Sequence, residues 1–422
     1  MSTELVVDRW IQTAFERGAS DIHVEPTGEE KVRVRLRCDG ALQLLETVSD
    51  APKILARIKH MAGLDVNERA HPLDGRINVA SIGGRHGLDI RVSVTPCVGG
   101  EKAVLRLIDN SRAGKKLEDM GMTPRMLQAY KNVIASPNGL ILHVGPTGSG
   151  KTTSLYAAVQ SINTNEINIQ TVEDPVEFQL QGITQTSVNH ELGLDFPKVL
   201  RALLRQDPNV LLVGEIRDTE TAEIAVEAAL TGHLVFSTLH TNDAVGSVVR
   251  LVDMGLAAYS LAYAIRGVVA QRFVRVICQA CRKSFAPPEA FVKLTGVTDR
   301  PIFAGEGCKE CRREGYSGRV PLFELMPMSL PLRKAIYAMA VPDELQVIAQ
   351  KNGLISLMQD GVDKVFGGIT TLEDMLRVVK GVMSLPKAQA PAPKKATRSV
   401  PPPAPRPAAA AAATPRPRPQ AR

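Results

Sequence analysis

The segment from Gly145 to Thr152 constrains this chain more than any other, because its eight residues read Gly-Pro-Thr-Gly-Ser-Gly-Lys-Thr. The apolar run 140–144 precedes it and has the pattern of a buried strand, while the residues from Lys151 onward suit a helix. Glycines let the backbone turn its N–H groups toward phosphate oxygens, and a helix that opens there adds the positive end of its dipole. The sequence therefore predicts an α/β fold with a site for the phosphates of a nucleotide.

Each position of this loop has an expected role. Lys151 is long enough to reach the β- and γ-phosphates, and the Thr152 hydroxyl is placed to ligate Mg²⁺. The alternative is a chance glycine-rich turn, and a full match between a strand and a helix argues against it. The predicted nucleotide-binding residues are Gly145, Pro146, Thr147, Gly148, Ser149, Gly150, Lys151 and Thr152.

Carboxylates follow two further strand-like runs. The run 210–213 ends in Gly214-Glu215, where an aspartate that binds Mg²⁺ usually follows the strand, and here the glutamate stands one place later. We expect Glu215 to polarise the attacking water, directly or as part of the Mg²⁺ shell, and the alternative is an ion pair with Arg217. Glu173 belongs to the acidic segment 171–177, whose adjacent carboxylates are costly to place together unless a cation lies between them.

A histidine ends another apolar strand, in the segment 237–242. One interpretation is that His240 senses the γ-phosphate or positions Glu215. The other is a buried structural histidine, and the residues alone weigh the two equally.

Four of the six cysteines form two Cys-x2-Cys pairs, 26 residues apart. Each pair can present two thiolates to one metal ion, and two pairs complete the tetrahedral sulfur shell of a structural Zn²⁺. Reduced cysteines without a metal are the alternative. The predicted ligands are Cys278, Cys281, Cys308 and Cys311, whereas Cys38 and Cys97 are expected to be small buried side chains.

Patterning along the chain predicts a small N-terminal α/β domain, a RecA-like core with a zinc-binding insert, and a helical C-terminal part. In the N-terminal domain we expect a helix over 7–16, with Trp10 and Phe15 in the core, and a strand over 31–37 whose basic face is solvated. Further expected elements are helices over 53–61, 126–134, 332–340, 344–350 and 372–379, and strands over 76–80 and 88–94 joined through Gly83-Gly84. The expected boundaries are 1–110 for the N-terminal domain, 111–137 for a linker with a short helix, 138–275 for the core, 276–324 for the zinc segment, 325–385 for the helical part and 386–422 for a disordered tail.

The net charge of +7 invites a nucleic-acid interpretation, but its distribution argues against one. The tail carries eight basic residues and no acidic ones, so subtracting these eight leaves −1 for residues 1–385. No apolar stretch approaches the ~20 residues that span a bilayer. The N-terminus also lacks a secretory signal pattern, which favours a cytoplasmic chain.

Together these motifs resemble the secretion ATPases that power type II secretion and type IV pilus assembly. The resemblance covers about residues 7 to 380. The matching segments are 145–152, 171–177, 207–218 and 232–242 in the core, 20–26, 74–77, 89–93 and 100–101 before it, and Ala270-Gln271-Arg272 with the tetracysteine segment after it.

The resemblance implies a homohexameric ring that binds ATP, Mg²⁺ and Zn²⁺, with the P-loop and Glu215 in one subunit's site. It also implies that arginines of the small N-terminal domain reach the phosphates, at the matching positions Arg76 and Arg91. Surface ion pairs are the alternative for both arginines. The implied partner is an inner-membrane platform protein, to which a cytoplasmic motor attaches peripherally while it drives assembly of pilin-like subunits.

Two departures from the family concern docking. The family pattern begins almost at Met1, so the long N-terminal docking domain of many members is expected to be missing, and the basic tail is unusual. The tetracysteine segment favours an assembly motor over a pilus-retraction ATPase, while type II secretion, pilus extension and DNA uptake stay open.

Two other function classes are the alternatives. A RecA-like nucleic-acid translocase would need a basic groove with aromatic side chains, and the near-neutral body and the aromatic content of 4% count against it. A zinc-bearing scaffold that binds ATP without hydrolysing it is disfavoured by the presence of both Lys151 and Glu215.

Overall fold

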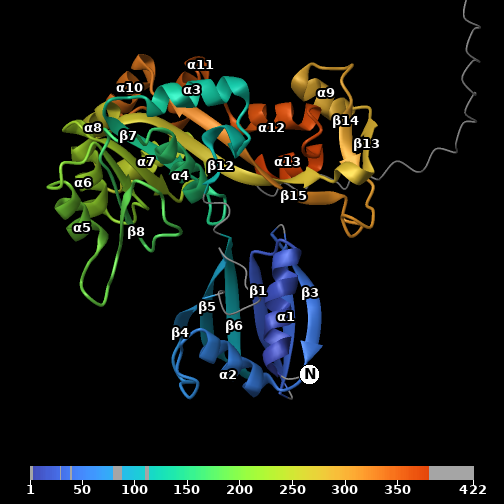
Figure 1. Ribbon diagram of the computed structural model, residues 1–422. Coiled ribbons are helices and arrows are strands. Elements are labelled where there is room, and N and C mark those ends of the chain that lie inside the picture. The colour runs from blue at the N-terminus through green and yellow to red at the C-terminus, as the bar shows by residue number, and fades with distance from the viewer. Residues whose placement is uncertain (1–2, 29, 39, 79–87, 110–113, 380–422) are drawn as a thin grey trace, which may run out of the picture. The chain divides into compact units, whose positions relative to one another are not determined.

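The structure is a computed structural model that describes residues 3–28, 30–38, 40–78, 88–109 and 114–379 (Figure 1). Its N-terminal part is an antiparallel sheet in the order β3-β2-β1-β6-β5-β4, packed against two helices. Trp10, Ile22 and Val34 belong to the core between them. The elements are α1 (Thr3–Glu16), β1 (Asp21–Gly28), β2 (Lys31–Cys38), β3 (Ala41–Val48), α2 (Ala51–Met61), β4 (Leu73–Asn78), β5 (Leu88–Cys97) and β6 (Gly100–Asp109).

Two of the N-terminal expectations are wrong. Phe15 is exposed, because the buried stripe of α1 consists of Val7, Trp10, Ile11 and Ala14, and the next residue lies outside it. Cys97 is also exposed at the end of β5, whereas Cys38 is buried as expected. The expected turn at Gly83-Gly84 lies outside the described residues, as do the last two residues of the expected strand 76–80.

The alternation of β2 is confirmed. Val32, Val34 and Leu36 are fully buried, while the basic residues between them lie on the other face. Arg33 and Arg35 on that face do not simply point into solvent, since both donate to the Glu25 carboxylate at 3.1 Å and 2.7 Å.

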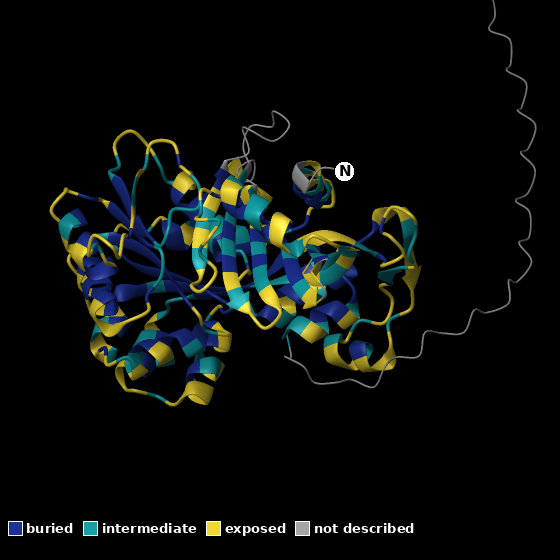
Figure 2. Ribbon diagram, turned by 90° about the horizontal axis from the view of Figure 1, so that it is seen from below, coloured by how far each residue is buried: buried dark blue, intermediate teal, exposed yellow. Residues whose placement is uncertain are grey.

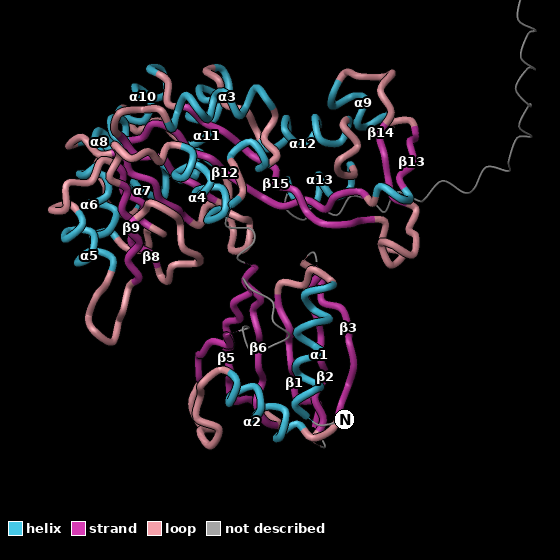
Figure 3. The backbone as a smooth tube through the Cα atoms, viewed as in Figure 1, coloured by secondary structure: helices cyan, strands magenta, loops and turns pink. Residues whose placement is uncertain are grey.

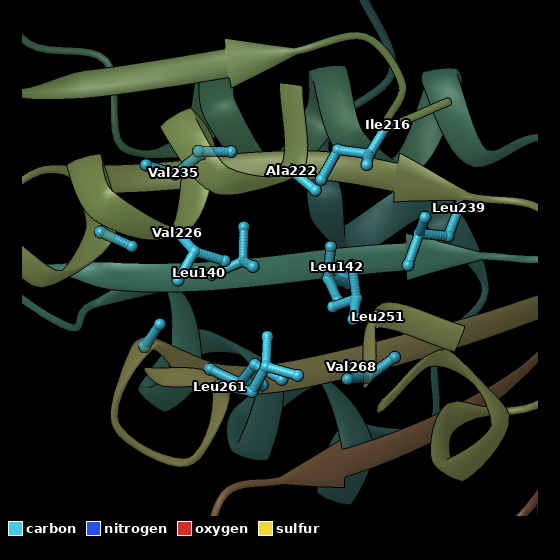
Figure 4. Close-up of a cluster of buried hydrophobic side chains, with 14 of the residues drawn as sticks. Leu140, Leu142, Ile216, Ala222, Val226, Val235, Leu239, Leu251, Leu261 and Val268 are labelled. Carbon is cyan, nitrogen blue, oxygen red and sulfur yellow. The ribbon is translucent and has the colours of Figure 1, made fainter. Parts of the chain in front are cut away.

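The second sheet, whose strands are magenta in Figure 3, has the order β15-β12-β7-β11-β10-β8-β9. Its strands from β12 to β9 run parallel. Apolar clusters cover both faces, which explains why β7, β10 and β11 are buried along their whole length (Figure 2). Side chains of β7 alternate between the faces: Leu140 and Leu142 belong to one cluster, which Figure 4 shows, and Ile141 belongs to the other. The strands are β7 (Gly139–Val144), β8 (Ile169–Glu173), β9 (Thr184–Ser187), β10 (Val210–Val213), β11 (Leu234–Leu239), β12 (Ile265–Ile277) and β15 (Tyr316–Pro327).

Helices on the two faces come from different parts of the chain. The cluster that holds Ile141 is built with α3 and α4, and the cluster that holds Leu140 is built with α5 to α8, α10 and α11. Among the described residues, no helix combines the length and the apolar character that crossing a bilayer requires. The helices are α3 (Pro124–Ile134), α4 (Lys151–Ser161), α5 (Phe196–Leu203), α6 (Thr219–Leu230), α7 (Ala244–Asp253), α8 (Ala258–Ala264), α10 (Leu330–Tyr337) and α11 (Pro342–Lys351).

The far end of β12 and β15 carries a smaller cluster with its own core, which includes Val274, Phe291 and Phe366. Its elements are β13 (Arg282–Phe285), α9 (Glu289–Thr295), β14 (Ile302–Gly305), α12 (Leu357–Phe366) and α13 (Leu372–Val379). No apolar period in the sequence predicts α12, because Asp360 and Lys364 on its buried side interrupt it. Helix α12 instead begins with a capping box between Ser356 and Gln359.

Candidate functional site

The P-loop joins β7 to α4 as expected. Gly145, Gly148 and Gly150 all have positive φ angles, which side chains rarely adopt. Space is limiting as well: a Cβ on Gly145 would lie 2.5 Å from the Gln271 carbonyl oxygen, and one on Gly150 would lie 2.8 Å from the Phe273 ring. The loop therefore presses its backbone against β12, and larger residues at these two positions would displace it.

Lys151 is the first residue of α4 and is 8% exposed. Its Nζ donates to the carbonyl oxygens of Gly145 and Pro146 at 2.8 Å and 3.2 Å. Burial lowers the pKa of Lys151, while the charge of Glu215 acts in the opposite direction. The ammonium group thus lies inside the loop that its own helix begins.

Glu215 follows β10, and its carboxylate has two side-chain partners. Arg217 forms an ion pair with one oxygen, and the His240 ring nitrogen Nε2 lies 3.2 Å from the other. Burial raises the pKa of Glu215, but the bonds and charges of Arg217 and His240 outweigh it and keep the pKa below its usual value. The structure therefore contains both the contact with His240 and the ion pair with Arg217 that the sequence offers as the alternative for Glu215.

Glu173 ends β8 and is 3% exposed. Three side chains donate to its carboxylate: the Tyr156 hydroxyl, the Thr171 hydroxyl at 2.6 Å and the Gln185 amide at 3.1 Å. The next residue, Asp174, accepts from Arg217 at 3.2 Å. Arg217 therefore bridges the two acidic segments that the sequence placed near the nucleotide.

One pocket brings the predicted core residues together. The P-loop residues from Thr147 to Thr152 line it, as do Glu173, Glu215 and His240. These residues come from segments at the ends of the four parallel strands β7, β8, β10 and β11, and from the start of α4. The carboxyl edge of a parallel sheet is where such folds bind nucleotides, because loops there converge on helix N-termini.

Arg76 and Arg91 lie in the N-terminal sheet, directly opposite each other on β4 and β5. Asp89 lies 3.8 Å from Arg76 as an ion-pair partner. The register continues the row, because Arg106 on β6 is opposite Arg91. No motif in the sequence points to Arg106, and only strand pairing reveals that these three arginines share one row.

The four predicted zinc ligands meet at one point, with all four sulfur atoms within 4.8 Å of one another. The separations Cys278–Cys308, Cys281–Cys311 and Cys308–Cys311 are 3.8 Å, 3.7 Å and 3.7 Å. A tetrahedron with Zn–S bonds of about 2.3 Å has edges of about 3.8 Å, so the donor set and its spacing fit Zn²⁺. Backbone N–H groups of Cys308 and Gly315 also donate to the Cys311 sulfur, as thiolate ligands require.

Comparisons with known proteins agree with this geometry. A family model described as "Type II/IV secretion system protein" matches residues 2–377. The type II secretion system protein E of Pseudomonas aeruginosa is 46% identical over 372 residues, which are 87% of this chain and 73% of that protein. The type IV pilus assembly ATPase PilB of Thermus thermophilus is 42% identical over 377 residues, which are 88% of this chain and 42% of that protein.

Solved structures share the fold. The ATPase DotB of Legionella pneumophila aligns with a TM-score of 0.68 at 22% identity, over 90% of this chain and 96% of that chain. The pilus retraction motor PilT with bound ADP aligns with a TM-score of 0.62 at 26% identity, over 88% of this chain and 96% of that chain. The chain therefore belongs to the type II/IV secretion system protein family and is one of its P-loop ATPases.

Proposed function

We propose that this ATPase is a homohexameric motor that couples ATP hydrolysis to the assembly of pilin-like subunits at an inner-membrane platform. The observation that carries the proposal is the convergence of Lys151, Glu173 and Glu215 on one pocket at the end of a RecA-like sheet. The names of the relatives support the assembly role, since they include type II secretion proteins and pilus assembly ATPases. The relatives do not favour the nucleic-acid translocase.

The P-loop residues hold the phosphates in this proposal. The backbone from Gly145 to Gly150 supplies N–H donors, and Lys151 leaves its two loop carbonyls to reach the β- and γ-phosphates. Thr152 and Glu215 hold Mg²⁺, which neutralises charge that develops on the phosphate oxygens when bound.

Glu215 is the group that polarises the attacking water. Its low pKa keeps it ionised at neutral pH, and the contacts with Arg217 and His240 fix its orientation. His240 is thereby a positioning residue that can also respond to the γ-phosphate. Glu173 contributes a second carboxylate to the pocket, held by its three donors.

Arg76 and Arg91 supply the charge that makes the site depend on the ring. Both lie in one row of the N-terminal sheet, so a rigid movement of that sheet carries both cations together. A cation that reaches the phosphates only in a closed arrangement couples hydrolysis to domain movement. The four cysteines hold a structural Zn²⁺ and take no part in this chemistry.

The test is the ATPase rate per subunit as a function of protein concentration, for the wild type, Glu215→Gln and Arg91→Ala. We expect the wild-type ATPase rate per subunit to rise with protein concentration. We expect this rate to collapse in both Glu215→Gln and Arg91→Ala. Arg17→Ala is the matched control, because this exposed arginine follows α1 and belongs to no part of the site. A rate that is independent of concentration and unchanged in Arg91→Ala would contradict the ring mechanism.

A further inference from the structure

Four fully buried polar side chains form a continuous chain behind the P-loop. The Tyr130 hydroxyl of α3 lies 2.6 Å from Nε2 of His143 on β7. Nδ1 of His143 lies 3.2 Å from the Ser154 hydroxyl of α4, and that hydroxyl donates to Oε1 of Gln271 on β12 at 2.6 Å. This series of hydrogen bonds therefore ends at Gln271, in the segment Ala270-Gln271-Arg272, which takes no part in the proposed chemistry.

The positions of the hydrogens in this chain follow from its last bond. Ser154 has one hydroxyl hydrogen, and Oε1 of Gln271 can only accept, so Ser154 donates to it. His143 must then donate from Nδ1 to Ser154, which leaves Nε2 to accept from Tyr130. Burial lowers the pKa of His143 to about 3, so the neutral ring carries the single hydrogen that this order needs. The chain thus fixes the Gln271 amide with its Nε2 hydrogens away from Ser154.

Those amide hydrogens face the P-loop. Nε2 of Gln271 is buried and has no hydrogen-bond partner in the part of the chain that the structure describes. A Cβ on Gly150 would lie 2.9 Å from this nitrogen, and one on Gly145 would lie 2.5 Å from the main-chain carbonyl oxygen of Gln271. The Gln271 main chain therefore lies against the start of the loop, while its side chain directs an unpaired donor toward Gly150 at the other end.

The loop carbonyls need such a donor when Lys151 turns to phosphate. In the structure, Nζ of Lys151 donates to the carbonyl oxygens of Gly145 and Pro146. A bound triphosphate draws this ammonium group to its β- and γ-phosphates, which removes the donor from both carbonyls. An unpaired carbonyl in a buried place is unfavourable, so nucleotide binding is tighter if another group replaces the lysine.

We propose that Gln271 is a positioning residue of the nucleotide site, whose amide N–H takes over a P-loop carbonyl that Lys151 leaves when it moves to the phosphates. The proposal rests on ATP binding at this P-loop, as stated under the proposed function. Gln271 contacts the loop and not the nucleotide, and Ser154 keeps its amide in the orientation that the exchange needs.

This role predicts that substitution of Gln271 weakens nucleotide binding and does not lower the stability of the fold. Gln271→Met keeps the length of the side chain and removes a buried donor that has no partner, which does not lower stability. The Ser154 hydroxyl can turn to the carbonyl oxygens of Lys151 and Gly150, at 3.0 Å and 3.3 Å, so it stays paired. Nucleotide binding, however, loses the replacement donor. If Gln271 had only a structural role, its substitution would instead lower the stability of the protein.

The matched control is Gln170→Met on β8. Gln170 is 6% exposed and its amide donates to the Gln206 carbonyl oxygen at 3.1 Å, away from the P-loop residues. The experiment measures the dissociation constant of Mg·ADP by calorimetry, and the melting temperature without nucleotide, for the wild type and both variants. We expect Gln271→Met to raise the dissociation constant about two- to twelvefold, the range of one net hydrogen bond, without a lower melting temperature. Gln170→Met should lower the melting temperature and leave the dissociation constant unchanged.

Two results would overturn the inference. One is a Gln271→Met protein that binds Mg·ADP as tightly as the wild type, and the other is an affinity loss that comes with a melting-temperature loss as large as that of Gln170→Met. Ser154→Ala is a second variant, which keeps the amide and removes the hydroxyl that orients it. An unchanged Mg·ADP affinity in this variant would also count against the role of Gln271. Failure of the wild type itself to bind Mg·ADP would instead refute the proposed function.

Discussion

The Tyr156 hydroxyl holds a buried carboxylate of the candidate site, and its removal gives a sharp prediction. Among the described residues, Tyr156 is the one recorded donor to Oε2 of Glu173, since Thr171 and Gln185 donate to the other oxygen. Burial raises the pKa of Tyr156, and the neighbouring Glu173 raises it further, so the hydroxyl stays protonated and donates. Tyr156→Phe removes this donor while it keeps the ring against Phe178, at 4.7 Å between centroids.

The magnitude follows from the kind of acceptor. A hydrogen bond to a charged group contributes about 1.5–3 kcal/mol to stability, whereas one between neutral groups contributes about 0.5–1.5 kcal/mol. Tyr130→Phe is the matched control, because this equally buried tyrosine donates to the neutral ring of His143. We therefore expect Tyr156→Phe to cost about 1 kcal/mol more of the free energy of unfolding than Tyr130→Phe.

Urea unfolding at pH 7 and a fixed protein concentration, followed by circular dichroism, measures both costs. The ATPase rate of Tyr156→Phe should also fall, because Glu173 loses one of the contacts that orient it in the pocket. The reasoning would be refuted if Tyr156→Phe were no more destabilised than Tyr130→Phe. It would then follow that the Glu173 carboxylate does not depend on this hydroxyl.

Three further predictions concern the buried charges and the cysteines. Lys364→Met leaves the fully buried Asp360 carboxylate without its ion pair and should cost about 3–5 kcal/mol in urea unfolding at pH 8. Burial raises the pKa of Asp360, so as the pH falls its carboxylate is protonated in the folded protein before it would be in the unfolded chain. The loss of unfolding free energy caused by Lys364→Met should therefore be smaller in the same assay at pH 5. Burial raises the pKa of Glu25, but hydrogen bonds from Arg35, Lys102 and Arg33 outweigh it and lower the pKa from 4.5 to about 2. The stabilisation of the fold by the ionised Glu25 is therefore fully present above pH 4.5 and is lost as the pH falls toward 2. Acid unfolding of Glu25→Gln should accordingly show a weaker pH dependence over that interval than the wild type. Cys311→Ser removes one of four thiolates and should abolish bound zinc in metal analysis and increase proteolysis between residues 278 and 311, with Mg·ADP binding retained.

Local motifs were the part of the site that could be predicted from sequence. The P-loop and the Cys-x2-Cys pairs specify their own geometry, because the residues that act together are close along the chain. Glu173, Glu215 and His240 were also found, since each follows an apolar strand and parallel strands end at one edge. Their partners Tyr156 and Gln185 were not, because a buried hydroxyl or amide carries no pattern of its own.

The features that were missed depend on pairing between distant segments. Gln271 meets the P-loop only because β12 lies beside β7, and Arg106 joins Arg76 and Arg91 only through the register of three strands. Helix α12 was hidden by Asp360 and Lys364, which look solvent-exposed in a sequence and form a buried ion pair in the fold. Tertiary packing decided these positions, and it overrode the local apolar period.

Strand β12 gives the molecule a mechanical property. Strand β12 begins beside Leu140 of β7, passes the P-loop at Gln271 and ends next to Cys278 (Figure 1). At ~3.3 Å per residue, its last seven residues therefore extend about 23 Å from the P-loop to the zinc cluster. Strand β12 also pairs with β15 over most of its length, and this pairing stiffens it. Because one paired strand joins the two places, we expect a displacement of the P-loop to move the cysteines as well, and a bound zinc ion to hold the chain together at that end.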